Sequence, residues 1–212
     1  RDIKKAIYYY TLAANQNDPQ AQYCLGLFYE KGKYVEKNII KAIQYYLLAA
    51  EQNNPDALFK IGWMYINEQY ANQNIKKALN YFLLAAKQNH SKALFNLGVI
   101  YYDGKFVERD INKSVHYYTL AAKQNNAYAQ FNLGLIYLEG KFIQRNIDKS
   151  IYYFTLAAKL NLVEAQCFLG NIFYDGKYVP RDINKAIYYY MLASDQNYAE
   201  AQCSLGFIYY EN

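Results

Sequence analysis

The sequence predicts an all-α fold: a right-handed α-solenoid of helix-turn-helix repeats with a 36-residue period. Two observations predict it. An apolar-Gly pair recurs at one fixed interval, without insertion or deletion. Apolar residues on both sides of a connecting loop also follow the i, i+3, i+4, i+7 spacing of amphipathic helices. Self-similarity at such a period is typical of solenoids, where each unit buries its apolar face against the next. The pairs are Leu25-Gly26, Ile61-Gly62, Leu97-Gly98, Leu133-Gly134, Leu169-Gly170 and Leu205-Gly206.

The repeat predicts a single continuous domain over the 212 residues. Residues 1–17 match the second helix of a unit, and residues 198–212 match a first helix without a second one behind it. Because the chain begins at Arg1 rather than Met, we expect a fragment whose two ends expose apolar faces. Either the parent chain continues, or the ends of two copies pair. Five complete helix pairs are predicted, at 18–53, 54–89, 90–125, 126–161 and 162–197.

The first helix of each pair, called helix A here, is predicted over Pro19–Lys31 in the first complete unit. Pro19 fits the first helical turn, where its missing N–H costs nothing. Gly32 fits the left-handed position that ends a helix, as do Gly104, Gly140 and Gly176. A glycine inside a helix costs up to about 1 kcal/mol relative to alanine. The recurrence of Gly26 therefore predicts a close backbone contact with the paired helix.

The second helix, helix B, is predicted to begin after Asn38, whose side chain can accept hydrogen bonds from the first backbone N–H groups. One apolar stripe runs from Ile39 to Ala50, and a second passes through Tyr45 and Leu48. A helix that is apolar on more than one side is expected between neighbours. The predicted N-caps of the other helices B are Asn74, Asp110, Asn146 and Asp182. Residues 67–71 lack the usual Gly-Lys loop, which predicts a remodelled turn there.

These motifs resemble two related families. Leu25-Gly26-x-x-Tyr29 with Ala42-x3-Tyr46 and Ala49 resembles the tetratricopeptide pattern, but the loop is longer and the period is 36 rather than about 34. The Gly-Lys-aromatic-Val loop makes the whole chain resemble the Sel1-like repeat. Some secreted members carry paired cysteines, whereas this chain has Ala50 and its equivalents at the second cysteine position. It therefore resembles the cysteine-free branch, and we expect a cytoplasmic protein.

Composition argues against several functional classes. The net charge is only +5, so no nucleic-acid partner is predicted. Cys24, Cys167 and Cys203 are isolated, and His90 and His116 fall at different repeat positions. We predict no disulfide, catalytic residue, metal or cofactor. No apolar run approaches the roughly 20 residues of a membrane span.

The resemblance to tetratricopeptides implies that helix A lines the concave face. Its inward positions are then three before, two before, one after and four after the repeat glycine. The last two vary in chemical type between units, as expected of a binding surface. Trp63 is the best aromatic anchor, and Asn96 and Asn132 are expected to hold a peptide backbone. The alternative is that the aromatic residues are partly core and the Asn pair bridges helices. The predicted partner-binding residues are Tyr23, Phe59, Lys60, Trp63, Phe95, Asn96, Tyr102, Phe131, Asn132 and Asn171.

The sequence thus predicts a non-enzymatic scaffold or adaptor that binds a protein or peptide, of unidentified sequence, in its concave groove. One alternative is a small-molecule-binding or hydrolytic enzyme related to cysteine-rich Sel1-like proteins. Another is a nucleic-acid-binding repeat protein. A row of cations along the A–B loops is a further candidate for an acidic partner or anionic lipid, against the simpler interpretation of a solvated loop edge. These cations are Lys33, Lys37, Lys105, Arg109, Lys141, Arg145, Lys177 and Arg181.

Overall fold

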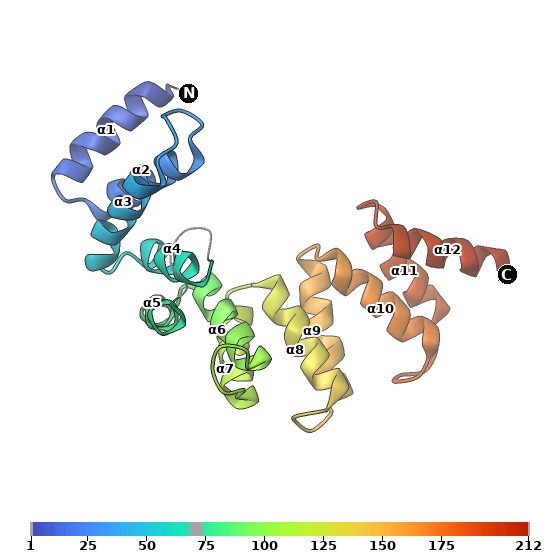
Figure 1. The fold of residues 1–212 in the computed structure, drawn as a ribbon. Helices are drawn as coiled ribbons and strands as arrows, with labels where there is room; N and C mark the ends of the chain where they lie inside the picture. Colours follow the sequence, from blue (N-terminus) through green and yellow to red (C-terminus); the bar gives the residue numbers. More distant parts are fainter. Residues whose placement is uncertain (1, 68–73, 212) are drawn as a thin grey trace. The chain divides into compact units, whose positions relative to one another are not determined.

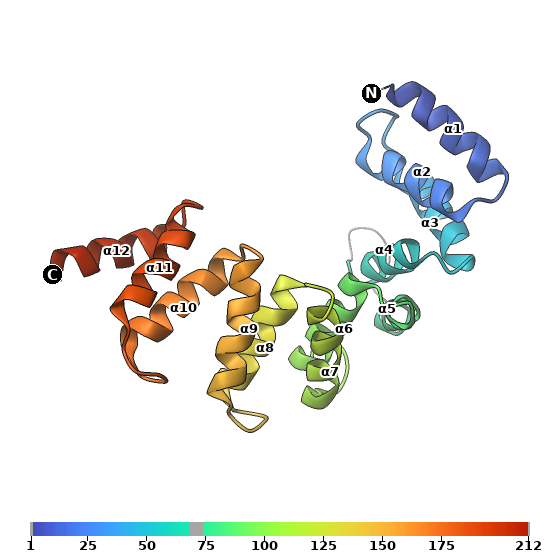
Figure 2. The same cartoon turned by 180° about the vertical axis from the view of Figure 1, so that it is seen from behind.

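The computed structural model describes residues 2–67 and 74–211, and every regular element within them is an α-helix (Figures 1 and 2). This confirms the predicted all-α class. Each helix covers about three turns, as the repeat predicts. The helices are α1 (Ile3–Asn15), α2 (Pro19–Lys31), α3 (Ile39–Glu51), α4 (Pro55–Ile66), α5 (Ile75–Lys87), α6 (Ser91–Asp103), α7 (Ile111–Ala122), α8 (Ala127–Glu139), α9 (Ile147–Lys159), α10 (Val163–Asp175), α11 (Ile183–Ser194) and α12 (Ala199–Glu211).

The chain forms two compact units, residues 1–108 and residues 109–212. The first unit contains α1–α6 and the second contains α7–α12. Within each unit, every helix packs against the next one in sequence. The most extensive packing joins helix A to helix B of the same repeat, as in the side-by-side pair α8 and α9 (Figures 1 and 2). Each unit is therefore an α-solenoid of stacked helix pairs.

The predicted helix boundaries are explained by side-chain caps. Asn38 Oδ1 accepts a hydrogen bond from Lys41 N at 2.9 Å, and the other predicted N-caps of helix B make the same bond. The backbone N–H of Asn38 also donates to Tyr29 O at 3.0 Å, which closes the A–B loop. The four loop glycines adopt φ between 62° and 66°, as predicted for residues that end a helix in the left-handed region.

The turns from helix B to the next helix A depend on a feature that the sequence analysis did not identify. An asparagine in the left-handed region ends every one of these turns in the described chain, with φ between 57° and 68°. Asparagine is the non-glycine residue that most readily adopts this conformation, since its short side chain bonds locally. The residues are Asn17, Asn53, Asn89, Asn125, Asn161 and Asn197.

Four mid-helix glycines, Gly26, Gly62, Gly134 and Gly170, lie in close contact with the paired helix B, chiefly with an aromatic ring. A Cβ added at Gly26 would lie 2.5 Å from the Tyr46 ring of helix B. Added at Gly134, it would lie 2.6 Å from the Phe154 ring. The predicted close approach to the paired helix is confirmed, and at Gly62 an added Cβ would also lie 3.2 Å from the Ala78 backbone oxygen. Glycine is required because a fully buried aromatic ring lies directly on the helix backbone.

The two apolar stripes of helix B have different environments. In the first stripe Ala42, Tyr46 and Ala49 are fully buried, whereas Ile39 and Ile43 are half-buried. In the second stripe, Tyr45 stacks on Tyr29 with centroids 5.8 Å apart, whereas Leu48 is 43% exposed. The expectation that this stripe is covered throughout was therefore wrong at Leu48.

The atypical second unit differs at its helix end. Helix α4 ends at Ile66, and Asn67 is already extended, with φ −90° and ψ 109°. The remainder of the turn predicted over 67–71 lies outside the described residues.

Candidate partner-binding surface

The candidate surface consists of the ten helix-A residues predicted to contact a partner. All ten are half-buried, so each side chain packs on one side and reaches solvent on the other. The first unit supplies seven of them, from α2, α4 and α6, and the second unit supplies three, from α8 and α10. A half-buried position suits recognition because packing fixes the side chain while part of it stays accessible.

The aromatic residues three before the glycine form the base of this surface. Tyr23 packs on Tyr46 with centroids 5.7 Å apart, and Phe131 packs on Phe154 at 5.4 Å. Phe59 repeats the contact on Phe82 at 5.7 Å. These rings extend the core that helix B supplies, so the alternative interpretation of a partly structural row fits their contacts.

A charged cluster occupies the middle of the surface in the first unit. Lys60 Nζ lies 2.8 Å from Glu30 Oε2 and 2.9 Å from Glu30 Oε1, linking α4 to α2. Both side chains are largely covered, with exposed fractions of 22% for Lys60 and 12% for Glu30. Tyr46 Oη donates to Glu30 Oε2 at 2.7 Å, and Lys60 Nζ lies 5.7 Å from the Trp63 ring centroid. The cluster holds Trp63 beside a fixed cation.

Two of the three asparagines predicted to contact a partner, Asn96 and Asn171, make hydrogen bonds within the chain. Asn96 Nδ2 donates to Lys92 O of its own helix at 2.8 Å. Asn171 Oδ1 accepts from Tyr190 Oη at 2.7 Å, and its Nδ2 lies 3.5 Å from Glu200 Oε1. Asn171 thus connects its own helix with α11 and α12, whereas Asn96, one of the pair for which bridging was the alternative, bonds within its own helix.

Sequence reasoning missed a relation between these polar residues and the core ring of helix B. A tyrosine occupies the ring position where helix A offers a polar acceptor, as with Tyr46 and Glu30. Where helix A offers only Leu135 and Leu138, the ring is Phe154. Burial raises the pKa of Tyr46 above its usual range, and hydrogen bonding to Glu30 adds to this. The alternation of Tyr and Phe along helices B from residue 46 onward was a signal that could have revealed it.

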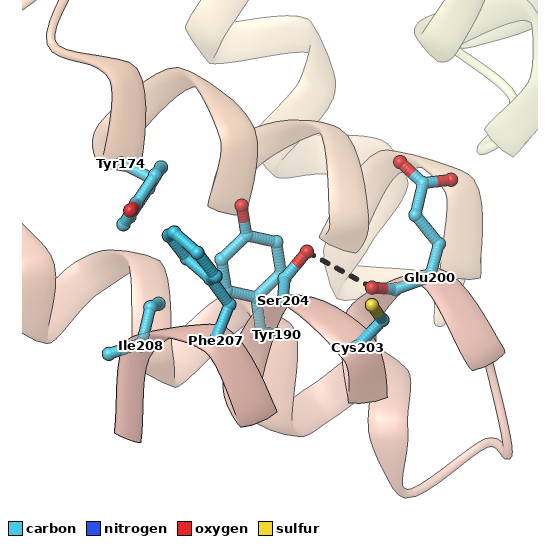
Figure 3. Close-up of a pocket in the computed structure, with 7 residues that line it drawn as sticks. All are labelled: Tyr174, Tyr190, Glu200, Cys203, Ser204, Phe207 and Ile208. Carbon is cyan, nitrogen blue, oxygen red and sulfur yellow. Dashed lines mark hydrogen bonds between the residues drawn. The ribbon is translucent and has the colours of Figure 1, made fainter. Parts of the chain in front are cut away.

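A cavity of about 300 Å³ opens beside α12 in the second unit (Figure 3). Four of its residues fall at the predicted inward positions: Tyr174, Cys203, Ser204 and Phe207. Ser204 Oγ donates to Glu200 O at 3.0 Å, so this hydroxyl is bonded to a backbone carbonyl of its own helix (Figure 3). Tyr190, Glu200 and Ile208 complete the lining. The inward positions therefore border an open hollow, three of whose seven lining residues are aromatic.

The loop cations lie against aromatic rings, the lysines against a ring of their own loop and Arg109 against a ring of the next A–B loop. Lys141 Nζ is 5.1 Å from the Phe142 ring centroid, and Arg109 Cζ approaches the same ring at 5.2 Å. Lys33, Lys105 and Lys177 make equivalent contacts with the residue that follows them. Such pairs fit a solvated loop edge ordered by cation–π contacts.

The histidines and cysteines occupy separate structural positions. His90 caps α6, accepting from Ala93 N at 3.2 Å, and its Nε2 lies 3.2 Å from Asp56 Oδ1. Burial lowers the pKa of His90, although Asp56 opposes this effect. The three cysteines are free thiols, and burial raises the pKa of Cys167 to about 12. Over residues 2–67 and 74–211, no group of three or more potential metal ligands is found, and no helix combines the length and apolarity needed to cross a membrane.

Stacked helix pairs with a half-buried, chemically variable helix-A surface define the class of protein: an α-solenoid of the kind typical of protein-interaction scaffolds. The Sel1 repeat profile matches residues 1–18, 19–54, 55–90, 91–126, 127–162 and 163–198. The chain belongs to the Sel1 repeat family, as its motifs predicted. Members of this family are generally non-catalytic scaffolds that bind other proteins.

Solved structures share this fold. The chain is 27% identical to c5321, a protective antigen of uropathogenic Escherichia coli displaying an SLR fold, with a TM-score of 0.92. The match covers 96% of this chain but 44% of the antigen. A Sel1 repeat protein from Oxalobacter formigenes is 29% identical, with a TM-score of 0.84, over 91% of this chain and 79% of that one. The immunity protein PA5088 of Pseudomonas aeruginosa, at 21% identity and a TM-score of 0.63, covers 94% and 76% and shows the fold alone. No curated protein matches the chain.

Proposed function

We propose that the chain is a protein-interaction scaffold that binds a peptide or partner protein through the concave, helix-A face of its repeats. The observation that carries this proposal is the arrangement around Trp63. Its indole is half-buried against the core cluster of Ala42, Tyr46, Ile61 and Met64, and it lies beside the paired cation of Lys60. An immobilised tryptophan next to a desolvated ion pair has the character of a binding hot spot, because little further entropy is lost when a partner covers it.

The variation between repeats supports the same conclusion. The position of Trp63 is occupied by Leu27, Val99, Leu135, Asn171 and Phe207 in the other units. Core positions, by contrast, keep nearly the same residue in every unit. The packing beneath this position stays the same while its residue type changes between repeats. Packing therefore leaves the position open to residues that suit a ligand.

The first experiment captures partners with the 212-residue chain and identifies them by mass spectrometry. The affinity of a captured partner is then measured by calorimetry for the wild type and for Trp63→Leu. Leucine is the residue at two equivalent positions, so this change preserves packing while removing the indole. We expect binding to weaken about tenfold or more, corresponding to roughly 1.4 kcal/mol or above.

Tyr8→Ala is the matched control, since Tyr8 is an exposed aromatic residue of the same unit on helix B, 59% exposed. Its affinity should equal that of the wild type. Equal affinity of Trp63→Leu and wild type, with unchanged helicity by circular dichroism, would show that the partner binds elsewhere.

A further inference from the structure

The cavity beside α12 is left open by a small side chain, Ser204. It is the hollow of about 300 Å³ lined by residues of α10, α11 and α12 (Figure 3). Tyr190 forms its base and is only 2% exposed, whereas Phe207 is 51% exposed and Tyr174 is half-buried. A ligand that enters the cavity from solvent can therefore reach the Phe207 and Tyr174 rings.

Another repeat fills the equivalent space with a side chain of its own. Lys60 holds the position of Ser204 in the second complete repeat. Its Nζ lies 6.0 Å from the Tyr46 ring centroid and 5.7 Å from the Trp63 ring centroid, and it pairs with Glu30 Oε2 at 2.8 Å. The residues equivalent to Tyr46, Trp63 and Glu30 around the cavity are Tyr190, Phe207 and Tyr174. A space of this kind thus accommodates a lysine side chain.

The chemistry of the surrounding residues matches the side chain that fills the space. Two long side chains hold this position in the chain, Lys60 and Phe168. Phe168 packs on Phe154 with centroids 5.0 Å apart, and the residue equivalent to Glu30 there is Leu138. An apolar surrounding therefore goes with phenylalanine, whereas a tyrosine and a carboxylate go with lysine.

Carboxylates also lie at the cavity beside α12. Glu200 is a lining residue, and Glu211 Oε2 accepts a hydrogen bond from Tyr174 Oη at 3.4 Å. Arg181 Cζ lies 4.9 Å from the Tyr174 ring centroid, so this ring already contacts one cation. Two carboxylates and one guanidinium leave a negative balance among these groups, which favours a cationic ligand.

We propose that this cavity binds a lysine side chain of a partner polypeptide. The ammonium group would lie between the Phe207 and Tyr174 rings, whose negative faces attract a cation, and near the Glu211 carboxylate. The methylene groups would pack over Ser204, in the space that the stem of Lys60 takes in its own repeat. The cavity lies at inward positions of helix A, so this inference rests on the proposed function and names one side chain that the surface recognises.

The chain supplies matched variants for the test. Ser204→Lys introduces the residue of the second complete repeat, which should occupy the cavity and block the site. Ser204→Ala keeps the cavity open, because it removes only a hydroxyl that bonds to a carbonyl of its own helix. Circular dichroism verifies that both variants fold.

Binding is measured by NMR titration of the ¹⁵N-labelled 212-residue chain with Nα-acetyl-lysine methylamide. We expect saturable shifts of the Ser204 and Phe207 backbone amides. Ser204→Lys should bind the probe about tenfold more weakly or worse, and Ser204→Ala should bind it as the wild type does. Nα-acetyl-norleucine methylamide has the same aliphatic stem without the ammonium group, so it should bind the wild type about fivefold more weakly or worse.

Several results would overturn the proposal. These are an absence of shifts, norleucine binding as tight as lysine binding, wild-type affinity of Ser204→Lys, or equal losses in the two Ser204 variants. The probe is free of any partner, so these results would refute the lysine site alone. The Trp63→Leu experiment tests the proposed function separately, in the other unit of the chain.

Discussion

Removing the hydroxyl group of Tyr46 tests whether the charged cluster stabilises the first unit. Tyr46→Phe deletes the donor that reaches Glu30 Oε2 at 2.7 Å. A hydrogen bond to a charged group contributes about 1.5–3 kcal/mol, compared with about 0.5–1.5 kcal/mol for a neutral pair. Lys60 remains on both carboxylate oxygens, so we expect a loss near 1.5 kcal/mol. The ring itself is fully buried and is retained.

The free energy of unfolding is measured by urea titration followed by circular dichroism. Tyr190→Phe is the matched variant, because its hydroxyl donates to the neutral Asn171 at the same distance of 2.7 Å. Its loss should be the smaller of the two. A double-mutant cycle of Tyr46→Phe with Glu30→Gln should show a coupling above about 0.5 kcal/mol, the usual limit of additivity for independent sites. Equal losses for the two tyrosine variants, together with no coupling in the cycle, would refute a stabilising role for the charged cluster.

Three further predictions follow from the packing. Gly134→Ala should destabilise the chain by roughly 1–3 kcal/mol because the new Cβ meets the Phe154 ring. Gly206→Ala places its Cβ where nothing lies within 4 Å, so it should stabilise the chain by up to about 1 kcal/mol. Urea midpoints of the two variants that shift in the same direction would contradict this contrast. Burial lowers the pKa of His90 below its ordinary value of about 6.5, so the unfolded state binds more protons. The stability that this residue contributes should be constant above about pH 6.5 and fall as the pH drops through the lowered pKa. His90→Asn should reduce this loss in thermal melts across that range. Leu160→Gln should raise the free energy of unfolding by about 1 kcal/mol, because the new carboxamide can donate to the buried Gln130 Oε1. An unchanged urea midpoint would show that leaving this acceptor without a donor costs no stability.

The local structure was largely predictable from the sequence because it depends on short-range physics. The N-cap at Asn38, the left-handed Gly32 and the proline in the first turn of α2 each satisfy backbone groups within a few residues. Repetition of these signals also predicted which helices pack together. The left-handed asparagines were equally local, and their strict recurrence at 36-residue intervals was available in the sequence.

The candidate site was predictable only as a set of positions. Periodicity assigned Lys60 and Trp63 to one face of a helix, and the structure finds both half-buried. It did not indicate that Lys60 pairs with Glu30 of the preceding repeat, thirty residues away. Side-chain partners across repeats depend on rotamers and on what the neighbouring helix offers.

The sequence by itself determined the repeat, the helix ends and the family, because these follow from backbone hydrogen bonding and hydrophobic period. Only the tertiary structure decided which polar groups are satisfied. Gln130 and Gln166 hold equivalent positions, yet Gln166 Oε1 accepts from Gln196 while Gln130 Oε1 has no donor among residues 2–67 and 74–211. The difference arises thirty residues away, at Leu160 and Gln196, and becomes a property of the site only when the helices pack and exclude water.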